Sequence, residues 1–222
     1  MSPLRTGLVF LAALALHGGV LAATSTARFG RERPSPAART IGNWVVASRD
    51  NGRAAFFIID KTNARLYVFD PLGKLRGAAP VLLGLAHGDD STPGIGEKPL
   101  SAIRRDERTT PAGRFVAQRG SNAQGEDIVW VDYAAAISLH RVRELNPYEH
   151  RLARLRSRTV ADNRISYGCI NVPVGFYNRV VETAWASGGV VVYVLPEQRA
   201  LAAVFPRPRT FVSAGPLLRR TG

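Results

Sequence analysis

Short apolar runs, separated by turn-forming residues, dominate the first half of the chain. Apolar and β-branched residues fill 54–60 and 66–70, and the second run ends in Pro71-Leu72-Gly73. Comparable runs return later, at 114–117, 128–132, 136–140 and 189–195. Runs this short and this often interrupted are typical of antiparallel strands in a β-sandwich or barrel, and not of βαβ units. The pattern predicts a mainly β fold.

Two later segments have a helical pattern instead. Between 173 and 187 apolar residues recur at helical spacing, at Phe176, Val180, Val181 and Ala184. Asn146-Pro147 provides a capping residue and a first-turn proline within an arginine-rich stretch, 141–164. We therefore expect one helix after residue 173, ending at Gly188-Gly189, and a short helix from Pro147 to about Ser157.

The chain begins with a pattern typical of an export signal. Arg5 precedes an apolar run over 8–16, and small residues follow up to Ala23. This order predicts a signal peptide over 1–23, followed by periplasmic or cell-envelope localisation. The apolar run is too short to cross roughly 30 Å of hydrocarbon, although the uncleaved leader could still tether the protein and contact the membrane transiently.

Composition divides the rest of the chain into three parts. Residues 24–40 are rich in Arg, Pro and Ser and have no apolar period, which predicts a linker. The folded domain is expected over 41–196, with a long loop at 86–109. Residues 197–222 have little period and are expected to form a loosely attached tail.

The net charge of +13 favours a polyanionic environment. A compositional bias toward arginine would produce the same charge without any function. For an exported protein, nucleic acid is the least available polyanion. The charge therefore fits a carboxylate-rich wall polymer and does not by itself identify one.

The single cysteine, Cys169, excludes an internal disulfide. Such a thiol is either a small buried apolar group or a reactive one. Gly168 permits a sharp turn that exposes the sulfur, and the N–H groups of Tyr167, Gly168 and Cys169 could face an oxyanion. A helix starting near Pro173 would add its positive end. These features favour a nucleophile.

A cysteine nucleophile needs a base, and the chain has four histidines: His17, His87, His140 and His150. His17 lies in the leader, His87 in the polar loop and His150 among arginines. His140 alone ends a predicted strand, where a rigid element could orient it. All four precede Cys169, an order that excludes papain-like enzymes.

The segment Ser166-Tyr167-Gly168-Cys169-Ile170-Asn171 resembles the cysteine signature of the L,D-transpeptidase catalytic domain. Thr110-Pro111-Ala112-Gly113-Arg114-Phe115 resembles a second segment of that domain, and the resemblance runs over about 56–195. It implies an enzyme that cross-links peptidoglycan stem peptides through an acyl-cysteine, with neither metal nor organic cofactor. Separately, we expect a monomer.

The resemblance also assigns roles to residues. Cys169 would be the nucleophile, His140 the general base and acid, and the carbonyl of Arg141 would orient the His140 ring. Gly168 and Cys169 would supply oxyanion donors. Ser166 and Asn171 would either brace the turn around the cysteine or contact the substrate.

Three departures from the family pattern are visible. Tyr167 replaces a histidine, Arg141 replaces a glycine, and the interval from 140 to 169 is long because of the arginine-rich insert. The insert is either a lid that binds carboxylates or a solvated charged helix. A sortase-like transpeptidase, an L,D-carboxypeptidase, an enzyme that attaches lipoproteins and a catalytically silent wall-binding module remain alternatives.

Overall fold

The computed structural model describes residues 26–205. Its largest sheet has five strands in the order β3-β2-β1-β11-β5. Their bounds are β1 Ala55–Asp60, β2 Arg65–Phe69, β3 Leu75–Pro80, β5 Gly113–Val116 and β11 Val190–Val194. The central pair, β1 and β11, is parallel, whereas the other pairs are antiparallel. The expectation of purely antiparallel strands is therefore wrong for this pair.

A second sheet has the order β10-β8-β7-β6 and contains the segments around His140 and Cys169. Its strands are β6 Gln118–Ser121, β7 Asp127–Asp132, β8 Ile137–Arg141 and β10 Ile170–Val172. Strands β8 and β10 run parallel. A small parallel pair, β4 Leu83–Gly84 with β9 Arg164–Ser166, lies beside this sheet.

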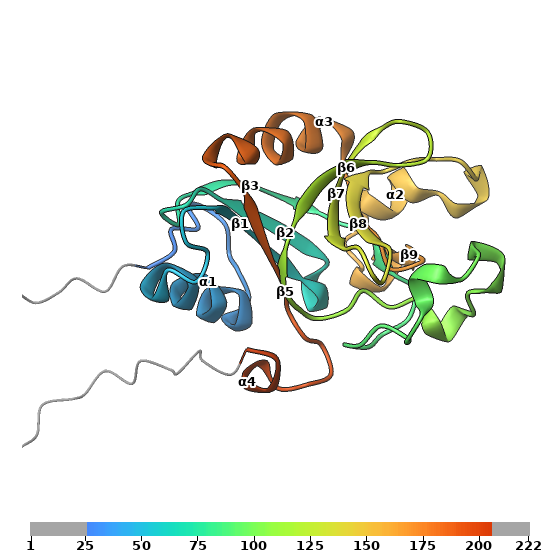
Figure 1. Ribbon diagram of the computed structural model, residues 1–222, viewed down its shortest axis with the longest axis horizontal. Coiled ribbons are helices and arrows are strands. Elements are labelled where there is room, and N and C mark those ends of the chain that lie inside the picture. Colours follow the sequence, from blue (N-terminus) through green and yellow to red (C-terminus); the bar gives the residue numbers. More distant parts are fainter. Residues whose placement is uncertain (1–25, 206–222) are drawn as a thin grey trace, which may run out of the picture.

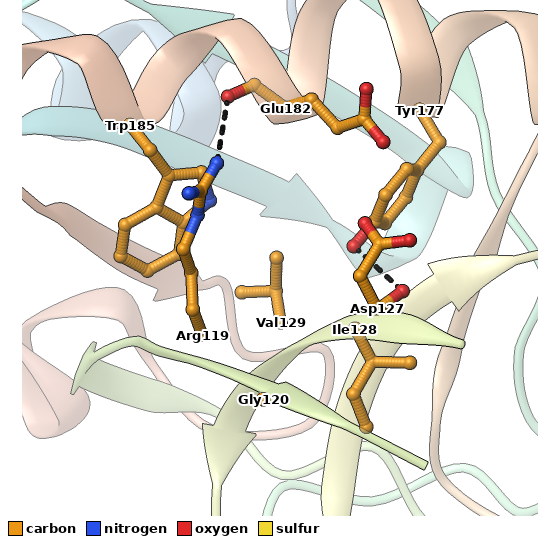
Figure 2. Close-up of a pocket in the computed structure, with 8 residues that line it drawn as sticks. All are labelled: Arg119, Gly120, Asp127, Ile128, Val129, Tyr177, Glu182 and Trp185. Atoms are coloured by element: carbon orange, nitrogen blue, oxygen red, sulfur yellow. Dashed lines mark hydrogen bonds between the residues drawn. The ribbon is translucent and has the colours of Figure 1, made fainter. Parts of the chain in front are cut away.

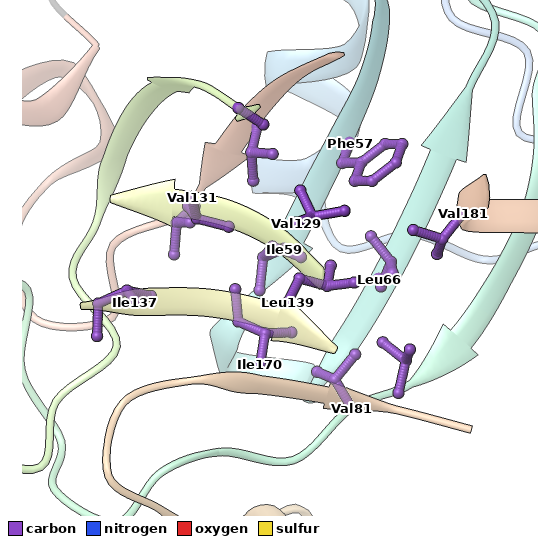
Figure 3. Close-up of a cluster of buried hydrophobic side chains, with 14 of the residues drawn as sticks. Phe57, Ile59, Leu66, Val81, Val129, Val131, Ile137, Leu139, Ile170 and Val181 are labelled. Carbon is purple, nitrogen blue, oxygen red and sulfur yellow. The ribbon is translucent and has the colours of Figure 1, made fainter. Parts of the chain in front are cut away.

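The main hydrophobic core lies between the two sheets (Figure 3). Phe57, Ile59 and Leu66 point into it from the first sheet, and Val129 and Leu139 from the second. Alternate residues of β1, β2, β7, β8, β10 and β11 contribute, as expected from side chains that alternate between the faces of a strand. The predicted β-sandwich is confirmed.

Both faces of the five-stranded sheet are covered, because helix α1, Pro36–Ser48, packs on the outer face (Figure 1). All six residues of β1 are buried, as in a strand with two covered faces. The helix starts where Ser35 accepts a hydrogen bond from the Ala38 N–H, and Pro36 occupies the first turn. Trp44 lies on α1 and packs edge-on against Tyr193.

Two boundary predictions are therefore wrong within the described residues. The linker expected over 24–40 contains the start of α1, and Ala27 and Phe29 are buried in the outer core. The tail expected from 197 packs as far as the description reaches: α4, Leu201–Val204, is followed by a buried Phe205. The predicted signal peptide over 1–23 and the last part of the predicted tail, 206–222, lie outside the described residues.

The helices predicted on either side of the cysteine are present. Helix α2, Arg151–Arg156, follows a 3-10 turn at Pro147–Glu149 that Asn146 caps. Helix α3, Val174–Phe176, continues through a π-helical turn at Tyr177–Val181 and a 3-10 segment at Glu182–Ser187. Between residues 26 and 205, no helix has both the length and the apolar character needed to cross a membrane.

Candidate active site

Gly168 forms the turn that presents Cys169 at the start of β10. Its φ of 131° lies in the region that favours glycine. A Cβ at this position would lie 2.6 Å from Ile137 Cδ1 and 2.8 Å from the Thr109 carbonyl oxygen. The turn therefore requires glycine both for its backbone conformation and for its close packing.

The register of β8 and β10 places four polar side chains on one face of the second sheet. Asn171 is paired with His140, and Ile170 with Leu139. Because side chains alternate along strands, Cys169 and Asn171 share a face, as do Ser138 and His140. The opposite face carries Leu139 and Ile170 into the core. The sheet thus separates a polar row from the apolar core.

The Cys169 sulfur contacts two groups of the β8 segment. It lies 3.5 Å from Ser138 Oγ and 3.6 Å from the Ala136 carbonyl oxygen. Burial raises the pKa of the thiol, but the charge of the nearby His140 imidazole and the contact with Ser138 outweigh it, so the pKa falls below its ordinary value. A depressed pKa favours the thiolate, which is the nucleophilic form.

A neighbour contacts each ring nitrogen of His140. Nδ1 lies 2.7 Å from the carbonyl oxygen of Arg141, which is the orienting contact expected from the sequence. Nε2 lies 3.2 Å from Asn171 Nδ2. A carbonyl only accepts and an amide NH₂ only donates, so these contacts favour a proton on Nδ1 and a lone pair on Nε2. This is the tautomer that a base acting through Nε2 requires.

Ser166 braces the turn. Its hydroxyl donates to the Cys169 carbonyl oxygen at 2.6 Å and accepts from the Gly168 N–H at 3.1 Å. The Gly168 N–H is therefore engaged, and the expectation that it would serve as an oxyanion donor is wrong for this conformation. Within residues 26–205, the Cys169 N–H has no hydrogen-bond partner and is free to donate to a ligand.

The predicted helix dipole does not act on the thiol in the expected way. Strand β10 separates Cys169 from the first residue of α3, Val174. Extended chain rises about 3.3 Å per residue, so the helix end lies beyond the first-turn range over which a dipole acts. The lowered pKa of Cys169 instead comes from His140 and Ser138.

A buried cluster of charged side chains contacts the segment that supports the cysteine turn. Lys61 lies 2.9 Å from Asp89 and 3.5 Å from Glu197, which also pairs with Arg164. These four side chains are at most 4% exposed. Lys61 also donates to the Thr110 carbonyl oxygen at 3.0 Å. Buried charges are tolerated when they are paired in this way.

Thr110 then connects the cluster to the cysteine turn. Its hydroxyl donates to the Gly168 carbonyl oxygen at 2.8 Å and accepts from the Gly84 N–H at 2.9 Å. Thr110 is fully buried, so no water replaces these bonds. The Thr-Pro segment noticed in the sequence therefore supports the backbone just before Cys169.

The Arg141 backbone carbonyl orients His140, and the Arg141 side chain is itself anchored by several contacts. Its guanidinium lies 2.7 Å from Asp127 and 2.6 Å from Glu182, and 4.1 Å from the Tyr177 ring centre. A cavity of about 260 Å³ adjoins these groups (Figure 2). It is lined by Arg119, Gly120, Asp127, Ile128, Val129, Tyr177, Glu182 and Trp185. Neither Cys169 nor His140 lines this cavity.

The arginine-rich insert is neither a free lid nor a fully solvated helix. Leu155 of α2 is buried against Leu82 and Val142. Arg154 donates to the backbone carbonyls of Glu149 and Asp162, and Arg151 donates to Asn171. The insert therefore packs beside the polar row and contacts one of its members.

Tyr167, which stands in place of a histidine, makes a cation–π contact with Arg108. The Arg108 guanidinium carbon lies 3.9 Å from the Tyr167 ring centre. Tyr167 is half-buried and packs against the main core. This side chain therefore contributes an aromatic surface beside the thiol.

Sequence reasoning missed Ser138, Thr110 and Arg151 as members of the site. Ser138 could have been found, because it lies two residues before His140 on a predicted strand and so shares its face. The contacts of Arg151 and Thr110 depend on tertiary packing. Across residues 26–205, no group of three or more His, Cys, Asp or Glu side chains is arranged to hold a metal ion.

No protein-family model matches the sequence, and neither does any curated protein. Among solved structures, the chain is similar to the helical cell-shape determining protein Pgp2 of Campylobacter jejuni. The TM-score is 0.40 and the identity 16%, with 66% of this chain and 48% of that chain covered.

The chain is also similar to L,D-transpeptidase structures of Enterococcus faecium. A crystal structure aligns with a TM-score of 0.36 and 16% identity, over 64% of this chain and 50% of that chain. The catalytic domain solved by NMR aligns with a TM-score of 0.34 and 16% identity, over 64% of this chain and 98% of that domain. The chain thus spans about half the length of the first two proteins.

Proposed function

We propose that this chain is an L,D-transpeptidase: an exported enzyme that remodels peptidoglycan stem peptides through an acyl group carried on Cys169. The observation that carries the proposal is the placement of Cys169 and an oriented His140 on one face of the second sheet, with Ser138 Oγ 3.5 Å from the sulfur. The lowered pKa of the thiol agrees with this geometry. The cysteine signature around Cys169 supports the same conclusion from the sequence.

In the first half of the reaction, the Cys169 thiolate attacks the carbonyl carbon at the third position of a donor stem. The Cys169 N–H donates to the oxyanion of the tetrahedral intermediate. The C–N bond then breaks, and His140 transfers to the departing D-alanine amine the proton that it took from the thiol. A thioester on Cys169 and free D-alanine result.

In the second half, the side-chain amine of a neighbouring stem attacks the thioester. His140 accepts the amine proton and returns it to the sulfur as the C–S bond breaks. The product is a new amide between two stems, and the thiol is regenerated. Because this scheme is acid–base chemistry on one nucleophile, it draws on no group outside the chain.

The test is muropeptide analysis of purified sacculi incubated with the protein and with Cys169→Ala. We expect new cross-links between third-position residues and released D-alanine with the unaltered protein, and neither with the variant. Tripeptide stems with free D-alanine but no cross-links would instead assign an L,D-carboxypeptidase. Unchanged muropeptides would favour the catalytically silent wall-binding module.

Export is part of the proposal and is tested separately. We expect the protein to be recovered from the cell envelope with its N-terminus near Ala23. N-terminal sequencing measures the cleavage position. Recovery of the intact chain in the cytoplasmic fraction would contradict export.

A further inference from the structure

Asn171 lies between the proposed base and the arginine-rich insert. It is fully buried, with its Nδ2 atom 3.2 Å from His140 Nε2. Its Oδ1 atom accepts a hydrogen bond from Arg151 Nη1 at 2.5 Å. One amide group thus joins His140 on β8 to Arg151 on α2.

The chemistry of these groups fixes which end of the amide faces which partner. A guanidinium donates and never accepts, so only Oδ1 of Asn171 can bond to Arg151. The NH₂ end is then directed at His140, and because it only donates, it favours a lone pair on Nε2. A reversed amide would place NH₂ against the guanidinium and Oδ1 against the imidazole, which favours a protonated Nε2.

Arg151 is held in place by its own contacts. Its Nε donates to Glu149 Oε2 at 2.5 Å, and its side chain is 13% exposed. Helix α2 is anchored by Leu155, which is buried against Leu82 and Val142. The guanidinium is therefore presented to Asn171 by a packed element and not by a free loop.

We infer that Arg151 is a positioning residue for His140: through Asn171 it keeps Nε2 unprotonated, so that His140 acts as a base toward Cys169. The inference rests on the proposed function and gives the insert a role in it. It also explains how the long insert between His140 and Cys169 serves the site, since the insert brings the Arg151 side chain to Asn171 on β10.

Several charged groups face this site. Glu149 pairs with Arg151 from the insert side, Arg108 stacks on Tyr167 next to the cysteine, and Cys169 itself titrates. The Arg141 guanidinium is engaged with Asp127 and Glu182. Of these, only Arg151 and its partner Glu149 act on the base through the Asn171 amide.

The test is the pH profile of Cys169 alkylation by iodoacetamide, followed by intact mass. Because Cys169 is the only cysteine, the adduct reports this thiol without any wall substrate. Arg151→Met frees the Asn171 amide to reverse and accept from a protonated Nε2. We expect the rise of the alkylation rate on the acid side of the profile to shift by about one pH unit toward lower pH. This is the effect of one hydrogen bond to a charged group.

Two further variants make the result specific. Arg151→Lys keeps a donor toward Asn171 Oδ1 and should restore the original profile. Arg154→Met is the matched control, because Arg154 lies on the same helix and donates only to backbone carbonyls. It should leave the profile in place even if the melting temperature falls.

The inference is overturned if folded Arg151→Met alkylates with the original profile, or if Arg154→Met shifts the profile equally. If Arg151→Met does not fold, Asn171→Asp provides the second measurement, since its carboxylate accepts from a protonated Nε2 and should move the acid limb down as well. An unmoved profile in that variant would contradict the inference. Failure of the proposed function would appear separately, as unchanged muropeptides.

Discussion

Nδ1 of His140 lies 2.7 Å from the carbonyl oxygen of the next residue, Arg141, whose side chain is tied to Asp127 and Glu182. The ring is therefore oriented by a backbone atom that is itself anchored through a side chain. Such support is what keeps a base aligned with its nucleophile.

His140→Ala should abolish most acylation of Cys169 while the protein remains folded. Removing one member of a coupled catalytic pair typically costs several powers of ten in rate. Intact mass after incubation with a carbapenem measures acylation, and circular dichroism measures the fold. His87→Ala is the control, because the His87 side chain is 64% exposed and pairs with Glu197. Full acylation by His140→Ala would remove His140 from the mechanism.

Ser138→Ala should raise the pKa of the Cys169 thiol, since the Ser138 hydrogen bonds help to lower it. The sign follows from the thiolate, which loses a donor when the hydroxyl is removed. We expect the alkylation midpoint to rise by up to about one pH unit, with slower labelling at neutral pH. A midpoint at or below the original value would show that Ser138 does not stabilise the thiolate.

Thr110→Val should destabilise the protein and disturb the cysteine turn together. Two buried partners, the Gly168 carbonyl and the Gly84 N–H, lose their hydrogen bonds. The free energy of unfolding should fall by about 2–6 kcal/mol, because each of the two unsatisfied buried groups costs about 1–3 kcal/mol. Urea denaturation measures the loss. Thr183→Val, which removes exposed hydrogen bonds to the backbone carbonyls of Arg179 and Val180, should change little.

Sequence reasoning singled out Cys169 and His140 as the proposed nucleophile and base because local features distinguish them from the rest of the chain. Cys169 is the only thiol and follows a glycine, and His140 alone among the histidines ends a strand. The contact between the Asn171 amide and Arg151 could not be predicted from the sequence, because it depends on the register of β10 and on where α2 packs. No spacing in the sequence encodes either.

The prediction of a linker over 24–40 was wrong for a different reason. Arginine and proline content masked a helix start, although Ser35 followed by Pro36 is itself a capping signal. The apolar residues Ile41 and Val45 lie four apart and pack on the sheet, which completes the helical pattern. Composition averaged over the segment thus outweighed two specific residues that pointed to the correct structure.

Asp89 should make the stability of the protein depend on acid pH. Burial raises the pKa of Asp89, but a hydrogen bond from Lys61 and backbone N–H groups of residues 197–199 lower it from 3.8 to about 2. A folded-state pKa below the unfolded one adds stability that is complete above about pH 4 and lost as the pH falls toward 2. The contribution is on the order of 2 kcal/mol.

Asp89→Asn should remove this acid-dependent contribution and lower the free energy of unfolding at neutral pH by about 3 kcal/mol, since Lys61 loses a buried partner. Thermal melts between pH 2 and 7 measure both effects. Asp90→Asn is the control, because Asp90 is 78% exposed. Parallel pH profiles for Asp89→Asn and the unaltered protein would contradict the assignment.

Acyl transfer to the sulfur of Cys169 is the central step of the proposed reaction, and intact mass spectrometry after incubation with a carbapenem measures it directly. We predict one adduct per chain, located on the peptide that contains Cys169 and absent from Cys169→Ala. No adduct on the folded, unaltered protein, or an equal adduct on Cys169→Ala, would contradict the account.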